Sequence, residues 1–336
     1  PAISRRYCRQ VSANSASGKA GRRKIPSVWI VRSCVSAAML ALIFHFVPFE
    51  TVWAAARQFS PGLWLAALGL FVAGHAAAAF KWRMLIGSGI SYRSAFRAHL
   101  AGLAANLALP GVAGGDVVRA GLVFGQANDK GKLAMGSIAD RLLDTLGLAL
   151  IALVGATYAW GPRLYEATQL RWALVALALV VATGFAAAPF LDRAMARRAA
   201  SGKVARILGS MIHAAAELSR SPGRLLACLA ISMAVQCLFV GINIAFAQAA
   251  HVEAPVSAWF FAWTTAKIIA IAPISLGGLG VREASMAGLL KPFGADPGQV
   301  IAVGLIWQSV LYASGAIGFL VQLRRPVREK VAMELN

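Results

Sequence analysis

Runs of apolar residues about 20 long recur along this chain and restrict what it can fold into, because a helix of that length spans a bilayer. Six such runs lie at 28–47, 61–80, 133–159, 172–190, 225–249 and 298–323. Apolar residues make up 59% of the chain and charged residues 14%, whereas globular proteins have about 45–50% and about 25%. The sequence therefore predicts an all-α polytopic membrane protein.

The net charge of +20 would suit a nucleic-acid partner if the charges formed one patch. Instead, 24 of the 33 basic residues lie in segments that alternate with the apolar runs and would share one side of the membrane. These segments are 1–27, 81–97, 130–132, 193–224 and 324–330. Because loops rich in Lys and Arg stay in the cytoplasm, we predict a bacterial inner-membrane protein with both termini cytoplasmic and no nucleic-acid partner.

The same distribution predicts the domain organisation. Residues 1–27 form a disordered basic tail, 28–323 the membrane domain, and 324–336 a cytoplasmic C-terminal tail. The first run could also be the apolar part of a signal peptide, but it is long for that role and small residues suited to cleavage lie well beyond it. We therefore expect an uncleaved first helix.

Two further apolar segments, 94–125 and 256–290, are interrupted by proline and glycine. They repeat one pattern at identical spacing, which reads Pro110, Gly114, Gly115 and Arg119 in the first and Pro273, Gly277, Gly278 and Arg282 in the second. The basic segments share one side of the membrane only if each of these two segments enters and leaves on the same side. We therefore predict two re-entrant hairpins. The halves 28–160 and 170–323 would then each cross three times, forming the inverted repeat of many transporters.

Three stretches, 106–120, 137–144 and 273–284, resemble motifs of the lysylphosphatidylglycerol synthase transmembrane-region family. The resemblance covers about 30–323 and implies a lipid flippase, which in the best-known members carries aminoacylated phosphatidylglycerol and is fused to a soluble aminoacyl transferase. We expect a stand-alone member without the transferase. Some stand-alone members are associated with hopanoid or glycolipid pathways. Many members carry an Arg near Trp307, Gln308 and Ser309, so a third cation expected of the site is missing here.

Non-helical backbone inside a membrane must be buried in protein or line a polar cavity. Helix N-termini at the two Gly-Gly breaks would attract an anion, and an Arg one turn further suits phosphate. The predicted substrate-binding residues are Arg119, Arg282, Gly114, Gly115, Gly277, Gly278 and Lys267. The alternative is that the glycines permit close helix packing and that each Arg pairs only with Asp116, Glu283 or a loop carbonyl. Lys267 would contact a headgroup or neutralise Glu283.

Ionisable residues also lie within or beside the apolar segments, where they are costly and usually functional. The predicted gating or coupling residues are Asp116, Asp140, Arg141, Asp144 and Glu283. Asp140 and Asp144 share a helix face, but they could instead lie in the headgroup zone near Lys132. Asn106 is expected to bond backbone groups freed by the first break. The five histidines are scattered without metal spacing and are expected to be packed or interfacial.

These features favour a lipid transporter that moves an anionic or phosphate-bearing lipid between leaflets, with no cofactor. No nucleotide-binding, triad or zinc-protease motif is present, so we do not predict an enzyme. The alternatives are a membrane-embedded enzyme of a lipid, glycolipid or hopanoid pathway, and an accessory or scaffold subunit. A homodimer and a separate lipid-biosynthetic enzyme both stay open as partners.

Overall fold

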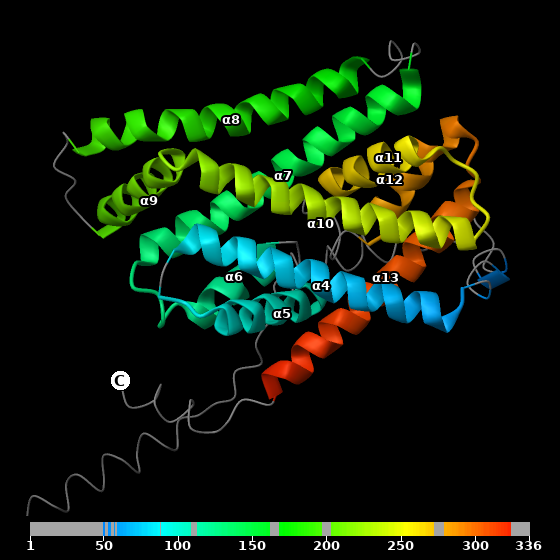
Figure 1. Ribbon diagram of the computed structural model, residues 1–336, viewed down its shortest axis with the longest axis horizontal. Coiled ribbons are helices and arrows are strands. Elements are labelled where there is room, and N and C mark those ends of the chain that lie inside the picture. The colour runs from blue at the N-terminus through cyan, green and yellow to red at the C-terminus, as the bar shows by residue number, and fades with distance from the viewer. Residues whose placement is uncertain are drawn as a thin grey trace, which may run out of the picture. The chain divides into compact units, whose positions relative to one another are not determined.

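The computed structural model describes residues 50, 53–54, 57, 59–87, 89–108, 113–161, 168–196, 203–271 and 279–323. The predicted tails, the first span 28–47, and the motif residues Pro110, Pro273, Gly277 and Gly278 lie outside the described residues. Within the described ranges the regular secondary structure is helical (Figure 1).

Five described helices are long and apolar enough to cross a membrane. They are α4 (Pro61–Ile86), α7 (Lys130–Trp160), α8 (Thr168–Ala196), α10 (Pro222–Ala249) and α13 (Pro297–Leu323). In α8 the candidate span is Val175–Ala194. These helices correspond to five of the six predicted runs, so the chain is an all-α polytopic membrane protein as predicted.

Helices α4 and α7 begin where the sequence supplies a capping side chain. The Ser60 hydroxyl accepts a hydrogen bond from the Leu63 N–H at 3.1 Å, with Pro61 as the first residue of α4. The Asp129 carboxylate accepts from the N–H groups of Gly131 and Lys132 at the start of α7. Such side chains satisfy donors that a helix leaves free in its first turn.

The two interrupted segments each form two short helices. The first contains α5 (Tyr92–Ala108) and α6 (Ala113–Val123), and the second contains α11 (Val256–Ile269) and α12 (Val281–Leu290). These helices are between 10 and 17 residues long, which is less than the roughly 20 residues needed to span a bilayer. In each segment the two short helices pack against each other. Helix–break–helix hairpins are thus confirmed, while their re-entrance on one side stays a prediction.

Each hairpin packs mainly on a long helix of the other half of the chain: α5 lies against α13, and α11 lies against α7 (Figure 1). Both contacts depend on a glycine. A Cβ on Gly318 would collide with the Leu100 carbonyl oxygen of α5, and one on Gly155 would lie 2.6 Å from the Phe261 nitrogen of α11. Small residues that let backbones approach are the usual contact points of membrane helices.

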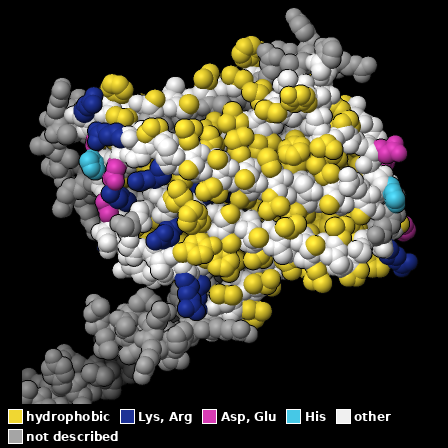
Figure 2. Space-filling view, viewed as in Figure 1, with side chains coloured by type: hydrophobic (Ala, Val, Ile, Leu, Met, Phe, Trp, Pro, Cys, Tyr) yellow, Lys and Arg dark blue, Asp and Glu magenta, His cyan; other side chains and the backbone are white. Residues whose placement is uncertain are grey.

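The surface of the protein suits a bilayer. Figure 2 shows apolar side chains over most of the face in view, with charged side chains mostly towards its left and right ends. Leu65, Val154, Val180, Phe190 and Phe319 are among the large apolar side chains that are more than half exposed. An apolar surface this extensive marks contact with lipid or protein.

Helix α9 (Lys203–Ser219) lies in the basic stretch 193–224 and adds to the predicted elements. It packs against α7 and α8, where Lys132 of α7 pairs with Glu217 at 2.7 Å and Asp192 of α8 contacts His213 at 3.2 Å. A short 3₁₀ helix, Lys291–Phe293, links α12 to α13.

Candidate functional site

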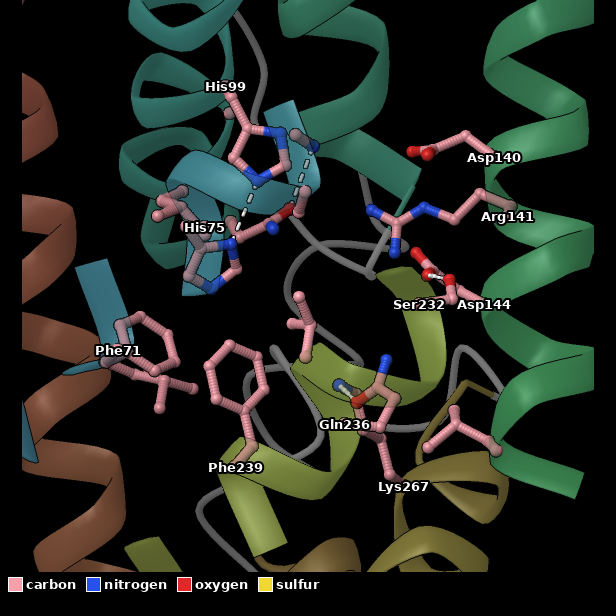
Figure 3. Close-up of a pocket in the computed structure, with 18 of the residues that line it drawn as sticks. Phe71, His75, His99, Asp140, Arg141, Asp144, Ser232, Gln236, Phe239 and Lys267 are labelled. Atoms are coloured by element: carbon pink, nitrogen blue, oxygen red, sulfur yellow. Dashed lines mark hydrogen bonds between the residues drawn. The ribbon is translucent and has the colours of Figure 1, made fainter. Parts of the chain in front are cut away.

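A cavity of about 420 Å³ lies between the two hairpins and the long helices α4, α7, α10 and α13 (Figure 3). This volume is in the range of small-molecule sites. Aromatic and aliphatic side chains form much of its lining, and charged and amide side chains from both halves of the chain also face it. The polar cavity that the two breaks predict is therefore present, and both hairpins contribute to it.

Lys81 is a buried cation of this cavity. Its Nζ lies 3.0 Å from Asp140 Oδ1 and also contacts the Asp144 carboxylate, and it donates to the Ser232 hydroxyl at 2.8 Å. The assignment of Lys81 to a cytoplasmic basic loop is wrong, because α4 continues through it to Ile86 and Lys81 is only 1% exposed. The two carboxylates, both on α7, offset the cost of burying this charge.

Arg119, one of the two predicted phosphate ligands, already has partners within the protein. Its NH2 group lies 2.9 Å from Asp140 Oδ2 and 3.4 Å from Asp116 Oδ1. Its NH1 group lies 3.1 Å from His99 Nδ1, and the guanidinium is 4.3 Å from the centre of the Trp82 ring. The contact with Asp116 is the ion pair that the alternative interpretation foresees, and the shorter contact is with Asp140, one of the predicted gating residues.

The carboxylates of α7 belong to the cavity. Asp140, Arg141 and Asp144 project from this helix towards the other polar side chains (Figure 3). Arg141 forms a two-point ion pair with Asp116, with its NH2 group 2.6 Å from Oδ1 and its Nε contacting Oδ2. The sequence left open whether Asp140 and Asp144 lie in the cavity or in the headgroup zone, and the structure places both in the cavity lining.

Arg282, the counterpart of Arg119 in the second hairpin, is also paired. Its NH2 group lies 2.5 Å from Glu283 Oε1 and donates to Gln308 Oε1 at 3.0 Å. Glu283 in turn accepts from the Gly280 N–H at 2.8 Å. Gly280 has a φ of 81°, which favours glycine, and α12 begins after it at Val281, so a helix start at Gly278 is wrong.

The first hairpin turn is held by the side chain predicted for that task. Asn106 Oδ1 accepts a hydrogen bond from the Gly115 N–H at 2.9 Å. A Cβ on Gly115 would collide with this oxygen and with the Gly102 carbonyl oxygen. Gly114 lies in the first turn of α6. The structural role of Asn106 is confirmed, and the Gly115 N–H has a partner within the protein.

Lys267 differs from the other cations of the cavity. Its Nζ donates to Gln236 Oε1 at 2.8 Å and lies 4.9 Å and 5.5 Å from the ring centres of Trp263 and Phe239. Among the described residues it forms no ion pair with a carboxylate. Lys267 does not neutralise Glu283, which pairs with Arg282.

Two histidines of the cavity were not predicted as site residues. His75 on α4 and His99 on α5 are joined by a hydrogen bond of 2.9 Å between His75 Nδ1 and His99 Nε2 (Figure 3). Both are packed inside the protein, but neither is isolated. The two histidines are 24 residues apart, which matches neither the spacing of one helix face nor that of a metal site. Only the packing of α4 on α5 reveals the pair.

The helices and this charged cavity define a polytopic membrane protein with a polar site enclosed between two helical hairpins. The model of the family described as lysylphosphatidylglycerol synthase TM region matches residues 29–318, and the chain belongs to that family. The resemblance of the three sequence motifs is thereby confirmed. A comparison with curated proteins gave no match.

Proposed function

We propose that this protein moves an anionic or phosphate-bearing lipid between the leaflets of its membrane, by alternating access around the two hairpins. Membership of a family named after a lipid synthase's membrane region supports a role with membrane lipids. The observation that carries the proposal is the contacts of Lys267, a cavity lysine that forms no ion pair with a carboxylate among the described residues.

The balance of charges can be counted from the contacts. The cations of the site are Lys81, Arg119, Arg141, Lys267 and Arg282, and the carboxylates are Asp116, Asp140, Asp144 and Glu283. Every one of these carboxylates pairs with an arginine or with Lys81. Among the described residues, Lys267 contacts an amide oxygen and two aromatic rings but no carboxylate. A charge that is partly removed from water without a counter-charge is costly, so an anionic headgroup beside the half-buried Lys267 would be stabilised.

We propose that the two hairpin arginines exchange their carboxylate partners for the lipid phosphate. Arg119 and Arg282 each line the cavity while they pair with carboxylates. A phosphate group at Lys267 would compete with those carboxylates for the guanidinium groups, because Arg binds phosphate through two parallel hydrogen bonds. Asp116, Asp140, Asp144 and Glu283, together with Arg141, would then act as the gating set that releases and recaptures the arginines.

The hairpins supply the means of alternation. Because α5 packs on α13 and α11 packs on α7, each hairpin is tied to the other half of the chain. We propose that the two halves are inverted repeats and that rocking one against the other opens the cavity to each leaflet in turn, as in other transporters with this plan.

The test measures transfer of a fluorescent short-chain phosphatidylglycerol between leaflets of liposomes that contain the purified protein. We expect Lys267→Gln to slow transfer about tenfold, which corresponds to a rise of roughly 1.4 kcal/mol in the barrier to transfer. Lys291→Gln is the matched control, because Lys291 is an exposed lysine outside the cavity, and it should transfer lipid like the wild type. Equal rates in wild type and Lys267→Gln would overturn the proposal.

The same liposomes separate this proposal from the alternatives. Mass spectrometry that finds covalently changed lipid would favour a membrane-embedded enzyme. Unchanged transfer after combined Arg119→Ala and Arg282→Ala substitution, in protein that still folds and inserts, would show that the two arginines take no part.

A further inference from the structure

Three polar side chains form a continuous chain from the charged part of the cavity to its aromatic part. Arg119 NH1 lies 3.1 Å from His99 Nδ1, and His99 Nε2 lies 2.9 Å from His75 Nδ1. The far ring, His75, packs edge-on against Phe71 with 4.4 Å between ring centres and lies 5.3 Å from the Phe239 ring. Both histidines line the cavity.

The direction of these hydrogen bonds follows from the donors available. A guanidinium group has only N–H donors, so His99 Nδ1 must accept from Arg119 and cannot carry a proton. A neutral imidazole with an unprotonated Nδ1 carries its proton on Nε2. His99 Nε2 therefore donates to His75 Nδ1.

The second ring, His75, is constrained in the same way. His75 Nδ1 accepts, so the proton of His75 must be on Nε2. Neither histidine can take a second proton while the chain of hydrogen bonds is intact, because two donors would then face each other. His75 and His99 are thus held neutral, so neither adds to the cationic groups of the cavity.

We propose that His75 Nε2–H is a fixed hydrogen-bond donor for an acceptor oxygen of the transported headgroup, held in this tautomer by Arg119 acting through His99. The inference rests on the proposed function and deepens it by naming a determinant of specificity. A fixed donor favours a phosphate or hydroxyl oxygen and disfavours an ammonium group at the same point, since two donors repel.

His75 is also placed to act together with Lys267. The ring of Phe239 lies between them, in contact with His75 on one side and 5.5 Å from Lys267 Nζ (Figure 3). A headgroup that covers this ring would reach the lysine with an anionic oxygen and His75 with a second oxygen. His99 and Arg119 act on the ligand through His75 and are positioning residues in this respect.

The first experiment uses two substitutions at His75 in the liposome transfer assay with phosphatidylglycerol. His75→Phe keeps a ring between Phe71 and Phe239 but removes both nitrogens, whereas His75→Gln keeps an N–H donor. We expect His75→Phe to raise the lipid concentration for half-maximal transfer about tenfold with little change in maximal rate, and His75→Gln to stay within about threefold of the wild type. His213→Phe, at an exposed histidine on α9, is the matched control and should change neither quantity.

The second experiment observes the tautomers directly, by nitrogen-15 solid-state NMR of histidine-labelled protein in bilayers. Protonated and unprotonated ring nitrogens are distinguished by their chemical shifts, and loss of signals in His75→Gln and His99→Gln assigns the two rings. We expect a proton on Nε2 and none on Nδ1 in both rings. In Arg119→Met, His99 Nδ1 loses its donor, so we expect a proton to appear on Nδ1 in part of the molecules.

The outcomes separate this inference from the proposed function. A wild-type protein that transfers no lipid overturns the proposed function, whatever the tautomers are. A proton on Nδ1 of either ring overturns the inference even when lipid is transferred. Wild-type lipid dependence in His75→Phe also overturns it.

Discussion

At the residue scale, the cavity is held together by ion pairs that share carboxylates. Asp140 lies between two cations, with Lys81 Nζ at 3.0 Å from one oxygen and Arg119 NH2 at 2.9 Å from the other. All three side chains are at most 3% exposed. Removing one member of such a cluster leaves a buried charge without compensation, which costs far more than losing an exposed pair.

Substitution of Lys81 tests this dependence. We expect Lys81→Met to lower the free energy of unfolding by about 3–5 kcal/mol, because Asp140 and Asp144 lose their shared lysine. Titration with sodium dodecyl sulfate in mixed micelles measures that free energy.

The matched control is Lys132→Met, which breaks the pair with Glu217. The Lys132 and Glu217 side chains are 38% and 44% exposed. Loss of their ion pair should therefore lower the free energy of unfolding by only about 0–1 kcal/mol. Equal effects of the two substitutions would contradict the buried role of Lys81.

At the element scale, the hairpins are positioned by close helix contacts rather than by their own length. Helices of 10 to 17 residues are too short to span the hydrocarbon core of a bilayer, so their apolar length cannot fix their position in it. Their place depends on α13 and α7, where Gly318 and Gly155 allow the backbones of α5 and α11 to approach.

Gly318→Ala should separate α5 from α13, since its methyl group would overlap the Leu100 carbonyl oxygen. We expect the free energy of unfolding to fall by about 1–3 kcal/mol, the usual cost of overpacking, together with slower lipid transfer. Gly241→Ala is the control on α10, because a Cβ there meets no atom within 4 Å. A Gly318→Ala protein as stable as the Gly241→Ala protein would show that the contact is not tight.

At the scale of the whole molecule, the order of elements is the same in the two halves: a long helix, a hairpin and a long helix, as α4 to α7 and as α10 to α13. Each hairpin also packs on the other half of the chain, with α5 of the first half against α13 of the second and α11 of the second half against α7 of the first. Both observations indicate an internal repeat. That the two halves are inverted stays a prediction, which follows from the basic loops.

Cysteine labelling tests the orientation. We expect Gln126→Cys, in the link between α6 and α7, to react with a membrane-impermeant maleimide only from the cytoplasm, and Lys291→Cys, after α12, to react only from outside. Both residues are exposed. The background is a chain without its four native cysteines. Reaction of both positions from the same side would exclude an inverted arrangement of the hairpins.

Much of this architecture is local in origin and could be predicted. Apolar runs set the long helices because a bilayer leaves the backbone no other way to satisfy its hydrogen bonds. The repeated Pro-Gly-Gly-Arg pattern marked both hairpins, and Asn106 could be assigned to the first turn because its partner, Gly115, lies only nine residues away.

The sequence by itself therefore determined the class of fold, the two breaks, and the set of residues around them. Only the tertiary structure decided the pairing: Lys81 with Asp140 and Asp144, His75 with His99, and Lys267 with an amide rather than with Glu283. These partners lie on different helices, 24 or more residues apart in all of these pairs. Their proximity depends on how helices pack, and periodicity along one helix carries no information about that.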